Sequence, residues 1–225
     1  MSIQSNIESV QARIAAAAQR VCRSPQEVQL VAVSKKVSPE VVEEALAAGV
    51  TVFGENKVQE AKAKIPQVSS RAHWHMLGHL QSNKARDAVT LFELIHSVDS
   101  VKLAAELDRW AERDGKTQRI LLEVNVSGEM SKFGLKPEEL PGTLSEINLM
   151  SRLEVHGLMT MAPFAEDTEK ARPFFRRLRA LAHDLGLQQL SMGMSHDFEV
   201  AIEEGATLVR VGTAIFGERK YDDEQ

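Results

Sequence analysis

The sequence contains little that would suit a disulfide-rich, membrane-bound or nucleic-acid-binding protein. It has one cysteine, Cys22, so no disulfide can form within the chain, which fits a reducing compartment. No apolar run approaches the roughly 18 residues that span a bilayer, and the N-terminus lacks the basic start and apolar run of a secretion signal. The net charge of -5 argues against a general nucleic-acid binder. We therefore expect a soluble cytoplasmic protein with no nucleic-acid or membrane partner.

Several motifs of catalysis and cofactor binding are absent as well. The chain has no glycine-rich motif for dinucleotides or nucleotide phosphates, and none of its serines lies in a nucleophile-elbow pattern. His73 and His75 flank Trp74 and would share one face of a strand, which could suggest a metal. No third ligand of a suitable type lies nearby in the sequence, so we expect no metal site.

The 225 residues do contain a regular alternation of short valine-rich strands and amphipathic helices. The first helix has apolar residues at spacings of three and four, namely Ile7, Val10, Ile14, Ala17 and Val21. Strands are expected at residues 28–34, 51–54, 75–77, 93–98, 119–126, 153–160, 189–193 and 207–212. Further helices are expected at residues 38–49, 56–65, 80–92, 100–113, 137–150, 166–185 and 197–204, with a short helix after the last strand.

About eight strand-helix units in a chain of this length predict a parallel α/β sheet closed into a single (β/α)8 TIM barrel. An open doubly wound sheet is the alternative. No linker, low-complexity segment or second domain interrupts the pattern, so we expect one domain over residues 1–225, beginning with a helix. Active sites of such barrels lie at the carboxyl ends of the strands, so the polar residues there are the candidates for a site.

Lys35 follows the first expected strand, VQLVAVS. Partial desolvation at the end of a valine-rich strand lowers the pKa of a lysine and makes its neutral, nucleophilic amine accessible, as Schiff-base chemistry requires. The alternative is that Lys35 and Lys36 are the solvated start of a loop. Adjacent residues of an extended segment point to opposite sides, so only one of the two should reach a site.

Two glycine-containing segments, SMGMS and VGTAIFG, follow the last two strands, where barrels often bind phosphate. Glycine lets backbone N–H groups approach an anion, and Ser195 and Thr213 add hydroxyl donors. These residues could equally be turn residues and helix caps. Arg210 lies within the last strand, where a charged side chain must pair with an internal carboxylate or face a ligand at the barrel mouth. In the second case Val209 and Val211 point the other way.

At these clusters the chain resembles the pyridoxal phosphate homeostasis protein family, also called the YggS/PROSC family. The resemblance covers nearly the whole chain. The matching stretches are LVAVSKK, FGENKVQEAKAK, WHMLGHLQSNK, NVSGEMSKFG, GLMTM and LSMGMSHDFEVAIEEGATLVRVGTAIFG. The resemblance implies the barrel domain of fold-type III enzymes that use pyridoxal 5′-phosphate (PLP), such as alanine racemase.

The resemblance also implies roles for individual residues. Lys35 is expected to hold PLP as a Schiff base, the internal aldimine, and Arg210 to face the pyridine nitrogen. The phosphate is expected on Ser195, Gly212 and Thr213. Asn56 is expected near the ring, as are, more loosely, His75 and Met194. Where relatives commonly have a tyrosine, this chain has Lys57, which puts an aromatic contact there in doubt and adds a positive charge near the mouth.

An arginine at the pyridine nitrogen disfavours protonation of that nitrogen, so the ring becomes a weaker electron sink. Racemisation also needs a second base, which alanine racemase takes from a tyrosine of an extra domain across a dimer. Here the only tyrosine is Tyr221, near the C-terminus. We therefore expect a monomer without proficient catalysis that buffers PLP or delivers it to recipient apo-enzymes, and so affects vitamin B6 and amino-acid balance.

Two other functions stay open. One is a PLP-dependent amino-acid racemase or transaminase of low activity, which the shared barrel and lysine would permit. The other is a regulatory protein that binds partners and whose PLP is structural.

Overall fold

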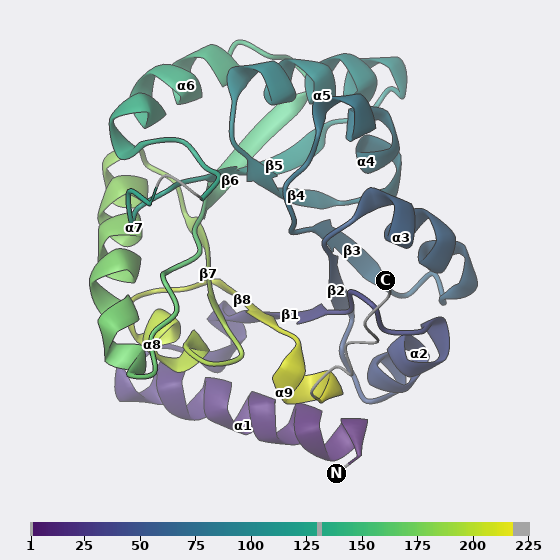
Figure 1. The fold of residues 1–225 in the computed structure, drawn as a ribbon, viewed down its shortest axis with the longest axis vertical. Helices are drawn as coiled ribbons and strands as arrows, with labels where there is room; N and C mark the ends of the chain where they lie inside the picture. The colour runs from purple at the N-terminus through teal and green to yellow at the C-terminus, as the bar shows by residue number, and fades with distance from the viewer. Residues whose placement is uncertain (1, 130–131, 218–225) are drawn as a thin grey trace, which may run out of the picture.

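A computed structural model describes residues 2–129 and 132–217. In this part of the chain eight parallel strands pair in sequence order, and β8 pairs with β1 to close the barrel (Figure 1). The strands are β1 (Gln29–Val33), β2 (Val52–Glu55), β3 (His73–Met76), β4 (Leu94–Val98), β5 (Gln118–Glu123), β6 (Leu153–Met159), β7 (Gln189–Met194) and β8 (Leu208–Val211). The predicted TIM barrel is confirmed, and the open sheet is excluded by the β1–β8 pairing.

The helices form a ring outside the strands, as Figure 1 shows. They are α1 (Ile3–Arg20), α2 (Pro39–Ala47), α3 (Val58–Lys64), α4 (Ala85–Leu91), α5 (Val101–Arg113), α6 (Leu140–Ile147), α7 (Arg172–Asp184), α8 (Phe198–Glu203) and α9 (Thr213–Phe216). Short 3-10 turns are Pro25–Glu27, Ile65–Gln67, Ser82–Lys84, Pro137–Glu139 and Thr168–Ala171. Within the described residues no helix combines the length and apolar character that a membrane crossing requires.

Two hydrophobic cores result from the alternation of side chains along each strand. The smaller core fills the barrel interior with Val31, Val52, Leu77, Leu94, Leu121, Met159 and Leu208. The larger core lies between the strands and the helices, and it includes Val209 and Val211. Because these two valines face the helices, Arg210 between them faces the barrel interior, as one of the two sequence interpretations requires.

Strand β5 ends at Glu123, three residues before the predicted end at Val126. The amide of Val124 still bonds to the carbonyl of Met159, but the next amide, that of Asn125, bonds to Leu135 in the following loop. The backbone after Glu123 therefore leaves the sheet to pair with its own loop. Hydrophobicity alone did not reveal this exchange of partners.

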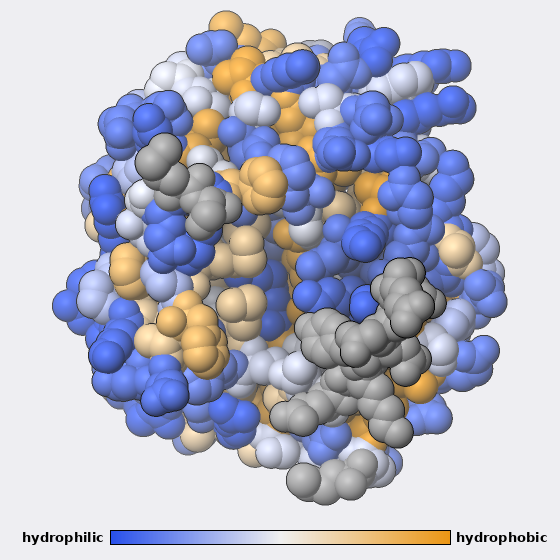
Figure 2. Space-filling view, in the orientation of Figure 1, coloured by the Kyte–Doolittle hydropathy of each residue, from blue (hydrophilic) through white to orange (hydrophobic). Residues whose placement is uncertain are grey.

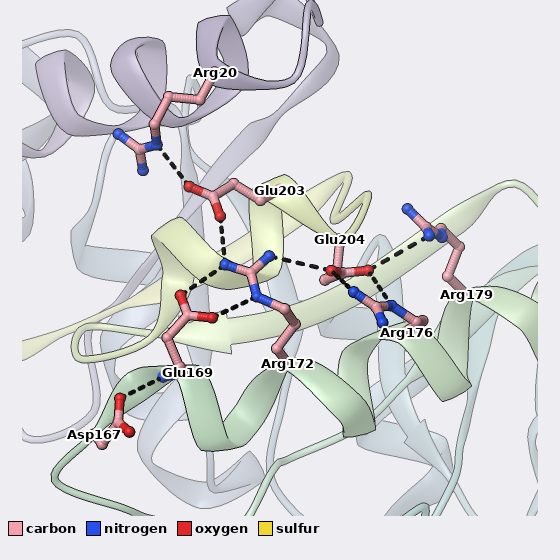
Figure 3. Close-up of polar contacts among 8 residues, drawn as sticks. All are labelled: Arg20, Asp167, Glu169, Arg172, Arg176, Arg179, Glu203 and Glu204. Carbon is pink, nitrogen blue, oxygen red and sulfur yellow. Dashed lines mark hydrogen bonds and ion pairs between the residues drawn. The ribbon is translucent and has the colours of Figure 1, made fainter.

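An ionic cluster fastens the helix layer on one side of the barrel (Figure 3). Glu204, with a side chain 5% exposed, accepts hydrogen bonds from Arg172 at 3.1 Å and Arg176 at 2.9 Å, and Arg179 lies 3.4 Å away. Through Glu203 the cluster reaches α1. We call the following residues the Glu204 cluster: Arg20, Glu169, Arg172, Arg176, Arg179, Glu203 and Glu204.

Candidate functional site

A cavity of about 290 Å³ opens at the carboxyl ends of β1, β2, β7 and β8. Its volume lies at the lower end of the range for small-molecule sites, roughly 300–1,000 Å³. It is lined by Val33, Lys35, Asn56, Leu77, Met161, Met194, Ser195, His196, Arg210, Gly212 and Thr213. Seven of the eight site residues predicted from the sequence are in this lining, and His75 is the exception.

The rim of this cavity is partly apolar. Met161 and Met194 are 38% and 39% exposed, and Phe164, after β6, is 82% exposed. Figure 2 shows apolar surface gathered beside the central hollow on the side of β7 and α8, with polar side chains around most of the remaining rim. The cavity therefore opens to water through a mouth with one apolar side.

Another cavity, of about 330 Å³, lies away from these residues and has a different lining. Gln11 and Ile14 of α1 contribute to it, together with residues 25–26, 28–30 and 49–51. Its lining contains no charged side chain and no nucleophile other than Thr51. It therefore offers a charged ligand no ionic partner, and we place the functional site at the other cavity.

Lys35 enters the site from the turn that follows β1. The amide of Ser34 bonds to the carbonyl of Gly54 on β2 at 3.0 Å, and the amide of Val37 bonds back to the carbonyl of Ser34 at 2.9 Å. Lys36, at the next position, has a left-handed backbone with φ 58°. This bend separates the two lysines, and Lys35, not Lys36, contributes to the cavity lining.

The β7–α8 turn and the start of α9 form a polar corner of the cavity. Ser195 Oγ accepts from the amide of Gly212 at 3.1 Å and from that of Ala214 at 3.5 Å. With its oxygen engaged in this way, the Ser195 hydroxyl keeps a hydrogen that it can donate to a ligand. Thr213 adds a second hydroxyl to the lining. Backbone N–H groups and hydroxyls gathered in one concave turn suit an anion with several acceptor oxygens, such as a phosphate.

Two residues shape this corner from behind. The amide of Met194 donates to Asp197 Oδ1 at 2.6 Å, which closes the turn between β7 and α8. Gly193 has φ 89°, and a Cβ there would lie 2.6 Å from the Cβ of Ala201 and 2.8 Å from the Cα of Phe198. Any side chain at Gly193 would therefore push α8 away and distort the position of Ser195.

Arg210 supplies a buried cation on another side of the cavity. Its guanidinium donates to Ser191 Oγ at 2.5 Å and to the carbonyl of Thr160 at 2.9 Å. Burial lowers the pKa of Arg210 to about 10, against the opposing effect of the Asp197 and Glu123 carboxylates. It remains cationic at neutral pH. Its hydrogen bonds go to a hydroxyl and a carbonyl rather than to a carboxylate, so they do not neutralise its positive charge. That charge can therefore interact with a ligand in the cavity.

A chain of buried hydrogen bonds continues from Arg210 through the barrel. Ser191 Oγ lies 2.8 Å from His96 Nδ1, and His96 Nε2 lies 3.0 Å from His75 Nδ1. Arg210 can only donate, so the Ser191 oxygen accepts from it. In the tautomer in which His96 Nδ1 accepts from the Ser191 hydroxyl, His96 Nε2 donates onward to His75. Burial lowers the pKa of His75 to about 3 and that of His96 well below its ordinary value, so both imidazoles are neutral.

This chain places His75 in the barrel interior, behind Arg210, and not in the cavity lining. Sequence reasoning did not single out His96 or Ser191, although each is a polar residue within a buried strand, the signal that did identify Arg210. It also missed Met161 and His196, although they lie two residues beyond the ends of β6 and β7, as Lys35 does beyond β1. In the described residues there is no group of three or more metal-ligating side chains, counting His, Cys, Asp and Glu.

Comparisons with known proteins agree with this geometry. Residues 5–220 match the family model described as the N-terminal domain of alanine racemase. The pyridoxal phosphate homeostasis protein of Aquifex aeolicus is 43% identical over 98% of this chain and 100% of its own length. The chain belongs to the pyridoxal phosphate homeostasis protein family.

Solved structures related to this homeostasis family support the same fold. PipY of Synechococcus elongatus, solved with PLP bound, is 38% identical and superposes with a TM-score of 0.85, covering 96% of this chain and 100% of PipY. Alanine racemase of Clostridium difficile superposes with a TM-score of 0.77 at 15% identity, over 100% of this chain and 58% of that enzyme. The second likeness shows the fold alone, and it corresponds to the barrel part of the racemase predicted from the sequence.

Proposed function

We propose that this chain binds PLP in the cavity at the barrel mouth and takes part in PLP homeostasis. The observation that carries the proposal is the convergence of three kinds of group on one cavity of about 290 Å³: the amine of Lys35, the guanidinium of Arg210 and the hydroxyl and N–H corner at Ser195. When bound, PLP supplies an aldehyde that a lysine can hold as a Schiff base, and a ring that can act as an electron sink.

The residues present fit this cofactor group by group. Ser195, Gly212 and Thr213 would hold the phosphate, and Lys35 would hold the aldehyde covalently. Arg210 would face the pyridine nitrogen. Asn56 and Met194, which line the same cavity, would lie beside the ring.

Arg210 also supports a role in cofactor supply rather than in proficient catalysis. Its persistent positive charge opposes protonation of a nitrogen placed against it, which weakens the ring as an electron sink. The neutral hydrogen-bonded chain of Ser191 and His96 cannot pass a proton through Arg210 to the pyridine nitrogen, because the guanidinium has no acceptor for that proton. We propose that the protein acts in the cytoplasm as a monomer, buffering PLP or delivering it to recipient apo-enzymes and so affecting amino-acid balance.

The absorbance spectrum with added PLP tests the cofactor site. We expect wild-type protein to show the band of a protonated Schiff base near the violet edge of the visible, and Lys35→Ala to lack it, with Lys36→Ala as the matched control. A band in Lys35→Ala that Lys36→Ala lacks would move the site to Lys36. Absence of the band in all three proteins would overturn the PLP proposal. Transfer of PLP to an apo-enzyme then tests delivery, which fails if no recipient regains activity.

The second candidate function is a weak amino-acid racemase or transaminase. His196 favours it, because this residue places an imidazole in the lining of the same cavity as Lys35. The discriminating measurement is exchange of the α-proton of amino acids in deuterated water. Exchange that depends on Lys35 and His196 would favour an enzyme, and its absence would favour the homeostasis role.

A further inference from the structure

A buried ionic cluster lies directly behind the turn that carries Lys35. Lys64, the last residue of α3, has a side chain only 6% exposed. Its ammonium donates to the carbonyl of Ser34 at 2.6 Å, to Glu55 Oε1 at 2.7 Å and to Glu60 Oε1 at 2.9 Å. These bonds use all three hydrogens of the ammonium. We call Ser34, Glu55, Glu60 and Lys64 the Lys64 cluster.

The Lys64 cluster holds both peptide groups that flank Lys35. The carbonyl of Ser34 belongs to the peptide bond before Lys35, and it accepts directly from Lys64. The amide of Lys36 belongs to the peptide bond after Lys35, and it donates to Glu60, which is itself bonded to Lys64. Because each peptide group is planar, fixing the two groups fixes the backbone angles from which the Lys35 side chain leaves.

The conformation of the turn shows that these contacts are needed. Lys36 has φ 58°, a left-handed conformation that residues with a side chain rarely adopt and that persists where surrounding contacts hold it. The same turn is held from the strand side as well, since the Ser34 hydroxyl donates to Glu55 at 2.7 Å. The direction of Lys35 therefore depends on contacts outside its own segment.

The cluster is poorly suited to a purely stabilising role. Buried ion pairs lose the hydration of their charges, and apolar residues of similar size often stabilise a fold as well or better. Burial raises the pKa of Glu55 in spite of the bond from Lys64, and Glu55 Oε2 is buried without a hydrogen-bond partner. The specific gain from the cluster is the fixed geometry around Lys35.

We propose that Lys64 is a positioning residue for Lys35, which it aims at the carbonyl carbon of an aldehyde held in the cavity. This inference rests on the proposed function, because it concerns the Schiff-base step. In that step the neutral Lys35 nitrogen forms a double bond to the aldehyde carbon, and the aldehyde oxygen leaves as water with the two amine hydrogens. A misdirected amine reaches the carbon less often, so the step slows even where the cofactor still binds.

The test compares Schiff-base formation with non-covalent binding in Lys64→Met, which removes the ammonium and keeps an unbranched side chain. Stopped-flow absorbance after mixing with PLP gives the rate of Schiff-base formation. Calorimetric titration with pyridoxamine 5′-phosphate, which has the same ring and phosphate but no aldehyde, gives the non-covalent affinity. Lys62→Met is the matched control, because Lys62 lies on the same helix in an exposed pair with Asp87.

We expect Lys64→Met to form the Schiff base about 10- to 100-fold more slowly than wild type, the scale of a small misplacement of reacting groups. Its affinity for pyridoxamine 5′-phosphate should stay within about twofold, and Lys62→Met should match wild type in both measurements. Formation at the wild-type rate in Lys64→Met, or an equal loss of both properties, would overturn the inference. If wild type itself forms no Schiff base, the proposed function fails instead.

Glu60→Ala covers the case in which Lys64→Met does not fold. Glu60 is partly exposed, and its removal frees the amide of Lys36 while leaving the buried pair of Lys64 and Glu55 intact. Slower Schiff-base formation with unchanged pyridoxamine 5′-phosphate affinity in this variant supports the inference, and wild-type rates overturn it.

Discussion

Lys64 and Glu204 each lie at the centre of an ionic cluster, but the groups around them differ in kind. Lys64 bonds to two carboxylates and to a backbone carbonyl next to Lys35. Glu204 contacts three arginine side chains of α7, Arg172, Arg176 and Arg179, which are 23%, 63% and 48% exposed. In the first cluster the pair of Lys64 and Glu55 is buried and is tied to the backbone. In the second cluster the arginines are partly exposed, and the contacts join side chains to side chains.

The pKa values of the buried carboxylates of the two clusters, Glu55 and Glu204, are shifted in opposite directions. Burial raises the pKa of Glu55, and the bond from Lys64 does not fully offset this effect. Burial acts on Glu204 in the same sense, but the bonds from Arg176 and Arg172 outweigh it, so the pKa of Glu204 is lowered. Ionisation of Glu204 therefore favours the fold, while ionisation of Glu55 opposes it. The comparison indicates that the Glu204 cluster stabilises the packing of α1, α7 and α8. The Lys64 cluster instead fixes the backbone around Lys35, at some cost to the stability of the fold.

The largest expected effect on this comparison comes from Lys64→Met. The change leaves Glu55 buried and without its cation, and breaking a buried pair in this way lowers the free energy of unfolding by about 3–5 kcal/mol. Urea denaturation measures it, and Lys62→Met should change the same quantity by less than about 1 kcal/mol because its pair is exposed. Equal losses in the two variants would mean that burial does not distinguish these lysines.

A smaller effect is expected from Glu204→Gln, which keeps the shape of the side chain and removes its charge. Hydrogen bonds to charged groups contribute more than neutral ones, and the arginines left behind can reach water, so the loss should be about 1–2 kcal/mol. The Schiff-base band with PLP should be unchanged, since the Glu204 cluster does not line the cavity. A weakened band would show that the two clusters are coupled, contrary to the separation described above.

The smallest expected effect is the pH dependence, which should have opposite signs in the two clusters. Glu204 has a lowered pKa, so its contribution is present above the ordinary value of 4.5 and is lost as pH falls through its folded pKa. Glu55 has a raised pKa, so its contribution falls as pH rises from 4.5 through its folded pKa. Denaturation from about pH 3 to pH 7 should show Glu204→Gln losing stability relative to wild type as pH rises toward 4.5, and Glu55→Gln gaining stability relative to wild type as pH rises above 4.5. Slopes of the same sign would contradict the assignment.

The sequence was sufficient to predict the barrel and most of the residues that it named in the lining of the candidate cavity, because both depend on local patterns. Valine-rich strands alternating with helices imply the closed sheet, and the strand-end rule selects Lys35, Ser195 and Gly212 without knowledge of their neighbours. Arg210 stood out because a charge within a buried strand needs an explanation. These signals can be read from a few adjacent residues.

The sequence did not predict which residues of other strands and helices contact Lys64 and His75. Lys64 lies among similar lysines in VQEAKAK, and only the packing of α3 against β2, which brings Lys64 to Glu55 and to the carbonyl of Ser34, shows that it is buried. The family resemblance implied that His75 lies near the ligand, yet its depth in the barrel depends on the pairing of β3 with β4, which carries His96. Tyr221, the tyrosine whose position near the C-terminus argued against a second base, lies outside the described residues.

The seam between β1 and β8 has a consequence for the order in which the protein folds. Val31 pairs with Arg210 there, so the first and last strands of the chain lie side by side and carry Lys35 and Gly212 to the same cavity. A chain synthesised from its N-terminus exposes Lys35 long before β8 exists, and contacts so distant in sequence are slow to form. Closing the barrel and completing the cavity are therefore a single event. A ligand that contacts residues of both β1 and β8 can bind only after the barrel has closed, and its binding then stabilises the closed barrel.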